Sequence, residues 1–274
     1  MAAHRPKVNQ HVKAALYEQA GRKCANPGCP SILLELHHIR EWHVYQTHDE
    51  AHMVALCATC HDHVDRGDLH ISDDDLYHWK GIPRVTRPTA HLFVEPGPPP
   101  ALLLGSICCR GDSGLTVFDL SGSLRLGFVV RDSDIMLLAL RVSDLEDNLI
   151  VEVVDGYVRS QDPRIELEHR PGRVTARRVS TVKVMPTWAK LSLLAADARC
   201  RVEELPVLDL HVLEPGLVRI QGIWMERDKG VVITEDRLSF LHRDRPHPIT
   251  IMGAGKKSVL HFAGPVSMSL FKLN

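Results

Sequence analysis

The sequence lacks both a large net charge and any long apolar run. Its 33 Lys and Arg against 34 Asp and Glu give a formal net charge of −1, so no global field would draw the molecule onto nucleic acid, and any such contact must be local. No uninterrupted apolar stretch approaches the roughly 18 residues of a membrane span. The first residues also lack the apolar run of a signal peptide. We therefore expect a cytoplasmic protein with no membrane partner.

Cysteine and histidine are concentrated near the N-terminus. Four of the seven cysteines and ten of the 17 histidines lie in the first 70 residues. In a reducing compartment, closely spaced cysteines bind metal or do redox chemistry more often than they form disulfides. Cys24 and Cys29 make a C-x4-C pair, and after 27 residues Cys57 and Cys60 make a C-x2-C pair. Two such turns can offer four thiolates to a tetrahedral Zn²⁺ at about 2.3 Å, and with every position filled by protein this zinc would be structural.

The chain is long enough for two domains, each with its own core. We expect a first domain over residues 1–81, a linker over 82–100 and a β-rich domain over 101–274. Six prolines between residues 83 and 100 favour a stiff, extended linker. In the first domain, Asn9 can cap a helix from about His11 to Ala20, and Ser72 begins a capping-box pattern for a second helix.

Beyond residue 100, short aliphatic segments alternate with Gly, Pro, Asp and Asn at intervals of roughly 8–12 residues. This spacing is typical of a β-sandwich or barrel, with a β-helix as the alternative. We expect Leu102 to Cys109 as one strand-like segment, Asp155-Gly156 as a hairpin turn, and Trp188 to Ala198 as the one helix. The remaining cysteines lie in apolar segments and are expected to be packing residues: Cys108, Cys109 and Cys200.

Further motifs surround the two cysteine pairs. They are Leu34-Glu35-Leu36-His37-His38-Ile39, His52-Met53-Val54-Ala55-Leu56-Cys57, and Cys60-His61. With the cysteine pairs, they resemble the zinc-bearing, four-cysteine branch of the HNH endonuclease family over about residues 24–67. The resemblance implies a ββα-metal module, in which a β-hairpin and a helix grip one divalent ion. The fold class is therefore expected to be α+β, with this module joined by the Pro-rich linker to a mostly antiparallel β domain.

The resemblance implies roles for five side chains. His37 and His61 would bind a catalytic divalent ion, Mg²⁺ or Mn²⁺ or another, and Asp65, four residues after His61 on the same helix face, would be a third ligand. His38 would be the general base, because an imidazole titrates near neutral pH. His52 stands where the family has an Asn that braces the loop carrying the base, and it can also hydrogen-bond. The neighbouring histidines are expected to have no site role: His43, His48 and His63.

Basic side chains offer only weak nucleic-acid contacts. Residues 1–70 carry seven Lys or Arg against eight Asp or Glu, so the first domain is not basic. A phosphate-contacting face is one interpretation of the basic stretch over residues 159–190, and the solvated outer face of strands is the other. The candidate contacts are Arg40, Arg66, Arg173, Arg177 and Arg178.

The sequence therefore predicts a metal-dependent endonuclease that hydrolyses DNA phosphodiester bonds. Its β-rich domain would recognise a target, sense a ligand or protein partner, or form a homo-oligomer, as in a defence nuclease under regulation. The alternative is a catalytically silent, zinc-stabilised module that binds DNA or protein. A third hypothesis is an effector that stays silent until the β-rich domain engages a partner.

Overall fold

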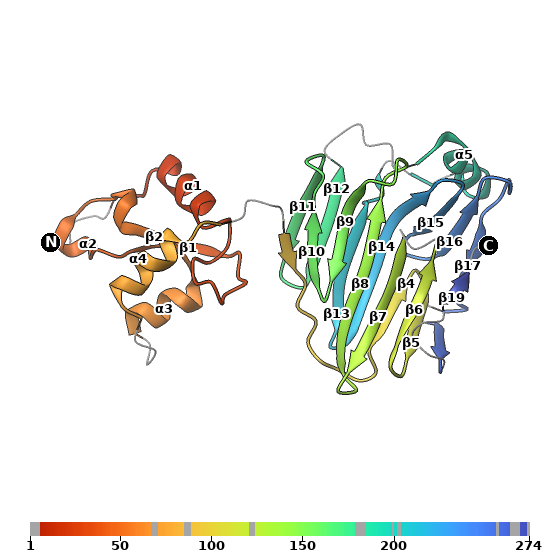
Figure 1. Cartoon of the computed structure of the whole chain (residues 1–274), viewed down its shortest axis with the longest axis horizontal. Coiled ribbons are helices and arrows are strands. Elements are labelled where there is room, and N and C mark those ends of the chain that lie inside the picture. The colour runs from red at the N-terminus through yellow and green to blue at the C-terminus, as the bar shows by residue number, and fades with distance from the viewer. Residues whose placement is uncertain are drawn as a thin grey trace. The chain divides into compact units, whose positions relative to one another are not determined.

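The computed structural model describes residues 6–66, 71–84, 89–120, 124–178, 185–198, 200–201, 204–255, 258–263 and 269–272. The chain divides into two units, Met1–Thr86 and Arg87–Asn274 (Figure 1). Each unit has its own cluster of buried apolar side chains. Within the described ranges, no helix is both long and apolar enough to cross a membrane.

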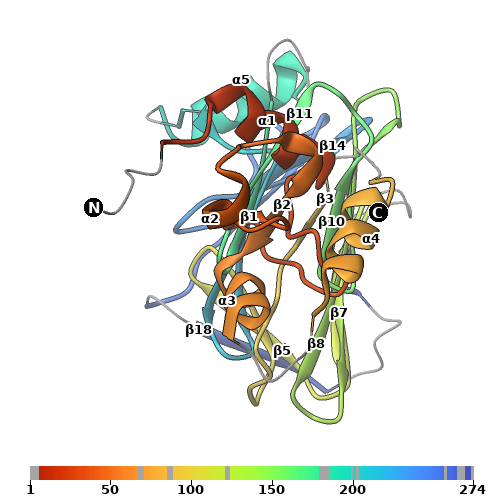
Figure 2. The same ribbon diagram turned by 90° about the vertical axis from the view of Figure 1, so that its left-hand side faces the viewer.

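The first unit contains a two-stranded sheet with helices packed against it. Its elements are α1 (Gln10–Gln19), β1 (Leu34–His38), α2 (Trp42–Tyr45), the short 3-10 helix η1 (Glu50–His52), β2 (Met53–Cys57), α3 (Ala58–Arg66) and α4 (Asp73–Gly81). β1 and β2 pair antiparallel, from Leu34 opposite Cys57 to His38 opposite Met53. Three helices, α1, α3 and α4, contact β2 (Figure 2). The order is thus two antiparallel strands followed directly by a helix.

Local capping explains where two of these helices begin. The side-chain oxygen of Asn9 accepts a hydrogen bond from the His11 backbone N–H at 2.8 Å. The Ser72 hydroxyl accepts from the Asp75 N–H at 3.2 Å, and the Asp75 carboxylate accepts from the Ser72 N–H at 2.9 Å. Each bond satisfies an N–H that has no partner within the helix. Both predicted caps are confirmed.

The second unit is mostly β. Its elements are β3 (Thr89–His91), β4 (Ala101–Leu104), β5 (Ile107–Gly111), β6 (Gly114–Asp119), β7 (Arg125–Arg131), β8 (Ile135–Ser143), β9 (Leu149–Val154), β10 (Tyr157–Ser160), β11 (Ile165–Arg170), β12 (Arg173–Arg178), α5 (Thr187–Ala196), β13 (Leu208–Glu214), β14 (Leu217–Glu226), β15 (Lys229–Ile233), β16 (Leu238–His242), β17 (Ile249–Ile251), β18 (Ser258–Phe262) and β19 (Ser269–Lys272).

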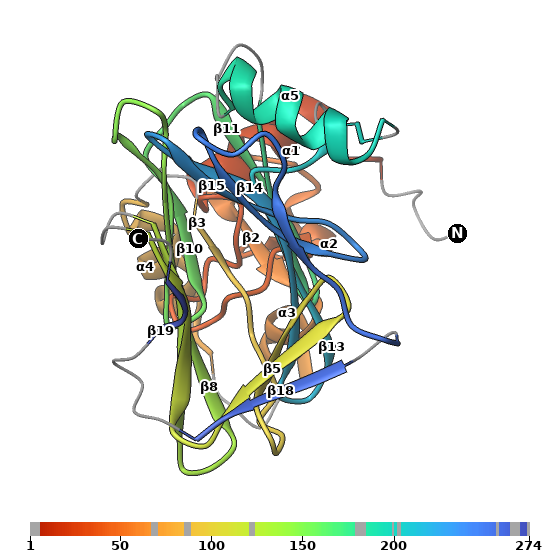
Figure 3. The same ribbon diagram turned by 90° about the vertical axis from the view of Figure 1, so that its right-hand side faces the viewer.

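These strands form two sheets that share one core. One sheet has the order β19-β6-β7-β8-β9-β10-β3. The other runs β11-β12-β13-β14-β15-β16-β17, with β4 beside β14, β5 beside β4 and β18 beside β5. The two sheets form two layers (Figure 3), and Phe118 of the first lies 5.8 Å from Trp224 of the second, between ring centroids. Helix α5 lies against β16. Most strand pairs are antiparallel; the described parallel pairs are β4 with β14, β5 with β18 and β6 with β19. This is the sandwich among the expected architectures, and its meandering strand order is not that of a β-helix.

Several local expectations in this unit are confirmed and others are corrected. Asp155 and Gly156 have φ values of 50° and 82° and join β9 to β10 in a hairpin, and α5 is the expected helix. The segment from Leu102 to Cys109 is two strands rather than one, because Gly105 adopts φ 61° and reverses the chain between β4 and β5. The aliphatic pattern of residues 173–184 predicts one strand; residues 173–178 form β12, and residues 179–184 lie outside the described residues. Within the expected linker, β3 pairs with β10, so residues 89–91 belong to the second unit.

Candidate metal centres

Four cysteines of the first unit come together from two turns. Cys24 and Cys29 lie on the loop before β1, whereas Cys57 ends β2 and Cys60 lies in the first turn of α3. Asn26 shapes the first turn: its side-chain oxygen accepts from Gly28 N–H and its carbonyl accepts from Cys29 N–H, both at 3.0 Å. We call Cys24, Cys29, Cys57 and Cys60 the four-cysteine cage.

The sulfur atoms of the cage have the spacing that a tetrahedral metal needs. All four lie within 4.8 Å of one another, and the Sγ atoms of Cys29 and Cys57 are 3.6 Å apart. Zinc–sulfur bonds of about 2.3 Å in a tetrahedron put neighbouring sulfurs about 3.8 Å apart. The cage could therefore hold a metal ion such as zinc, and no position would be left for a substrate.

The cage thiols lie in surroundings where a bound cation would stabilise their charged form. Burial raises the pKa of the Cys24 thiol to about 11, and burial together with the nearby Cys24 raises the pKa of Cys60. A divalent cation removes this penalty, because its charge stabilises the thiolates. Backbone N–H groups point at two of the sulfurs, from Cys57 to Cys24 and from Cys60 to Cys57, each at 3.4 Å. Such N–H contacts orient ligands around metal–thiolate centres.

A second group of donors is more open. Donor atoms of His37, His61 and Asp65 lie within 4.8 Å of one another. Nδ1 of His61 is 3.2 Å from one Asp65 oxygen, and Nδ1 of His37 is 3.7 Å from the other. The Asp65 side chain is 46% exposed, whereas three of the cage cysteines are buried. His37 is buried, His61 is half-buried and Asp65 is exposed, so two imidazoles and a carboxylate can bind a divalent ion that is reached from the Asp65 side and leave positions for other ligands. We call these three residues the open cluster.

The strand pleat separates His38 from the open cluster. Successive side chains of a strand point to opposite faces, so His37 turns towards α3 while its neighbour His38 turns the other way. There the His38 ring lies 5.7 Å from the Trp42 ring, and its Nε2 lies 3.0 Å from Nδ1 of His48. Both His37 and His38 are buried, at 9% exposure. The proposed ligand and the proposed base are thus adjacent in sequence but face different neighbours.

His52 lies outside the open cluster. Its Nδ1 is 2.7 Å from the Tyr77 hydroxyl on α4, and its Nε2 is 3.8 Å from an Asp49 oxygen. Its backbone carbonyl accepts from the Ile39 N–H at 2.9 Å, directly after His38. The residue therefore connects the end of β1 to α4 through its backbone and its side chain. Tyr77 and His48 were not expected as site residues, because the sequence gives no local sign of contacts across 25 and 10 residues.

The candidate nucleic-acid contacts have protein partners. The Arg40 guanidinium lies over the Tyr45 ring at 5.5 Å, and Arg66 is 3.9 Å from Asp62. In the second unit, Arg173 donates two hydrogen bonds to the buried Asp209, at 2.7 and 3.1 Å. Two further arginines share its strand: Arg177 lies 3.7 Å from Glu168, and Arg178 lies opposite Ile165. These pairings on β12 favour the strand-face interpretation over a phosphate-contacting one.

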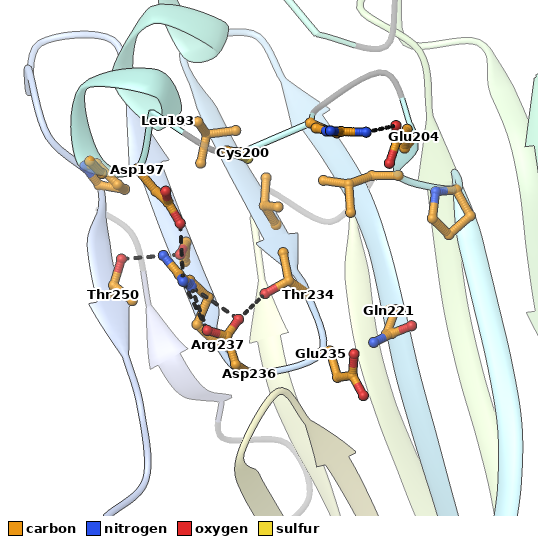
Figure 4. Close-up of a pocket in the computed structure, with 17 residues that line it drawn as sticks. Leu193, Asp197, Cys200, Glu204, Gln221, Thr234, Glu235, Asp236, Arg237 and Thr250 are labelled. Atoms are coloured by element: carbon orange, nitrogen blue, oxygen red, sulfur yellow. Dashed lines mark hydrogen bonds and ion pairs between the residues drawn. The ribbon is translucent and has the colours of Figure 1, made fainter.

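The second unit contains a pocket of about 470 Å³ beside α5. Its walls come from α5, the segment after it and strands β14 to β17 (Figure 4). Among the lining residues, Arg237 lies 3.3 Å from Asp197 and 2.8 Å from Asp236, and Thr234 donates to Asp236 at 2.7 Å. The remaining cysteines agree with the expected packing role. Cys108 and Cys109 are buried, and burial together with Cys108 raises the pKa of Cys109 to about 12. Cys200 is partly buried against the core of the second unit and also lines the pocket.

Comparison of the chain with protein families, curated proteins and solved structures gave no match. Any functional assignment therefore depends on the residues and distances described above.

Proposed function

We propose that the first unit is a metal-dependent nuclease of the HNH type that hydrolyses DNA phosphodiester bonds. The observation that carries the proposal is the open cluster of His37, His61 and Asp65, with His38 directly after His37 on β1 and on the opposite side of the strand. The four-cysteine cage is a closed site and suits a structural zinc. A module that only binds DNA or protein has no need for a second, open group of metal ligands.

Metal binding and proton transfer would be carried out by different residues. His37, His61 and Asp65 would hold Mg²⁺ or Mn²⁺, which when bound neutralises the negative charge that develops on the phosphate and the leaving oxygen. His38 accepts a proton from the attacking water while a lone pair of that water forms the new bond to phosphorus. The electron pair of the P–O3′ bond departs with the 3′ oxygen, which then takes a proton from solvent. His38 returns its proton to solvent and is ready for another cycle.

The second unit would regulate this activity in a defence nuclease, and the pocket beside α5 supports that part of the proposal. Its volume of about 470 Å³ lies within the range of small-molecule sites, roughly 300–1,000 Å³. A regulated enzyme would cleave only when it is oligomerised or when a ligand or protein partner occupies the second unit.

Cleavage of supercoiled plasmid with Mg²⁺ or Mn²⁺ tests the proposal. We expect His38→Ala to lose at least ~10²-fold in rate, as for an essential general base, with zinc content and melting temperature unchanged. His43→Ala is the matched control, because His43 is exposed and lies beside Glu41 at 2.9 Å; it should cleave like the wild type. Equal rates for His38→Ala and the wild type would remove His38 from the mechanism. Cleavage that begins only when the wild type is oligomerised would support the regulated enzyme, and no cleavage in either the monomeric or the oligomerised state would favour the silent binding module.

A further inference from the structure

The imidazole of His38 is held by a second histidine. Nε2 of His38 lies 3.0 Å from Nδ1 of His48, and Nε2 of His48 lies 2.8 Å from the carbonyl oxygen of Pro6. The His48 ring also stacks on Trp42, with centroids 4.4 Å apart and planes 21° from parallel. His48 is therefore fixed by Pro6 and Trp42, and it contacts His38 through one defined nitrogen.

The Pro6 carbonyl determines which ring nitrogens carry hydrogen. A carbonyl oxygen only accepts, so Nε2 of His48 must carry the hydrogen of that bond. A neutral imidazole has one N–H, which leaves Nδ1 of His48 as an acceptor. Nε2 of His38 must then carry its own hydrogen and donate it to His48. The lone pair of the His38 ring is consequently on Nδ1.

We propose that His48 is a positioning residue that holds His38 in the Nε2–H form and so makes Nδ1 the atom that accepts the proton from water. The catalytic meaning of this statement rests on the proposed function, whereas the hydrogen-bond chain itself does not. Without His48, the His38 ring would exchange between its two neutral forms and rotate, and only part of the population would present a lone pair in the right direction. The segment between β1 and β2 thus positions the His38 ring through His48, a role that the cysteine and histidine motifs do not predict.

Three variants separate positioning from a structural role. His48→Ala removes the acceptor, and we expect cleavage to fall by roughly 10- to 10²-fold, as for a misplaced catalytic group. His48→Gln should recover most of the rate, because its amide oxygen can accept from His38 and its amide N–H can donate to the Pro6 carbonyl. His48→Lys offers only donors and should not recover it. The Mn²⁺ concentration for half-maximal rate should stay unchanged in all three, since none alters the open cluster. Wild-type rates in His48→Ala, or equal rates in His48→Gln and His48→Ala, would overturn the proposal.

Nuclear magnetic resonance of the intact, ¹⁵N-labelled wild type tests the hydrogen-bond chain without any cleavage. At about pH 8, His38 should show a protonated Nε2 and an unprotonated Nδ1, and His48 should show the same form, as the contacts of His38 with His48 and of His48 with the Pro6 carbonyl require. An Nδ1–H form of His38 would overturn the proposal even in an active enzyme. The expected forms in a protein that never cleaves would instead contradict the proposed function and leave the positioning of the ring established.

Discussion

The two units differ in what holds them together. Among the described residues of the first unit, eight buried side chains form the core cluster, and three of these are cysteines of the cage: Cys24, Cys57 and Cys60. The core of the second unit runs through both sheets and includes the fully buried Phe118, Phe128 and Trp224. A small module with so few apolar contacts needs a staple such as a metal, whereas a large sandwich can be stabilised by burial alone.

The two units also differ in what their polar side chains contact. In the first unit, Cys60 of the cage directly precedes His61 of the open cluster on α3, so the same turn of helix carries a candidate structural ligand and a candidate catalytic ligand. In the second unit, the charged groups of β12 and its neighbours are paired within the sheet. We therefore expect substitutions at the candidate catalytic histidines of the first unit to change the cleavage rate more than the stability, and substitutions on β12 to do the reverse.

Replacing His52 tests the expectation that substitutions in the first unit change the cleavage rate. Its expected effect is larger than that of the β12 substitutions. His52→Ala should lower the maximal cleavage rate by ~10²-fold, because misplacing a catalytic group by about 1 Å has consequences of that size. It also leaves the Tyr77 hydroxyl without its partner at 2.7 Å. His52→Asn should retain or raise the activity, since Asn can make similar hydrogen bonds.

Titration with Mn²⁺ decides between a bracing and a ligand role for His52. A lower maximal rate at an unchanged half-saturation point indicates a brace. A raised half-saturation point in both variants would mean that His52 binds the ion, contrary to its position outside the open cluster. No change in either variant would mean that His52 has neither role and does not correspond to the bracing Asn of the HNH family.

Replacing the arginines of β12 tests the expectation that substitutions on this strand change the stability more than the cleavage rate. Arg173→Ala removes two hydrogen bonds from Asp209, which is 1% exposed. We expect a loss of about 1–3 kcal/mol in the free energy of unfolding, below the value for a fully buried pair because Arg173 is partly exposed. Arg177→Ala is the matched comparison on the same strand and should change stability by less than about 1 kcal/mol.

Binding of a DNA duplex at several salt concentrations completes this test. If the arginines only cover the strand face, neither variant changes the salt dependence of binding. A phosphate contact would instead reduce the slope of log K against log salt by about 1 for each arginine removed. A reduced slope for both would return β12 to the candidate nucleic-acid surface.

Features that depend on neighbouring residues were predicted from the sequence, and those that depend on distant ones were not. The Asn9 and Ser72 caps, the Asp155-Gly156 turn and the two cysteine pairs each follow from residues a few positions apart. The spacing of His61 and Asp65 likewise follows from the helical repeat. The pairing of His38 with His48 depends on how the loop between the strands folds back, for which no local pattern exists.

Strand pairing in the second unit shows the same limit. The sequence pattern does not predict β11, because Glu166, Glu168 and His169 interrupt the aliphatic residues, yet β11 pairs with β12 along its whole length. The parallel contact of β4 with β14 joins residues more than 100 positions apart, and only the packed core specifies it. The reversal at Gly105 does have a local signal, because the pair Gly105-Ser106 interrupts an apolar run and is typical of a turn.

The most direct test of the account is removal of metal from the intact wild-type chain, followed by hydrogen exchange mapped to each unit. Elemental analysis of protein washed with a weak chelator should show about one zinc per chain, and X-ray absorption at the zinc edge should show four sulfurs at about 2.3 Å. A strong chelator that removes this zinc should abolish protection of the β1 and β2 amides while those of β7, β8 and β14 stay protected, because structural zinc supplies folding free energy of roughly 10–16 kcal/mol in small modules. Protected β1 and β2 amides in zinc-free protein would contradict the claim that a metal holds the first unit together.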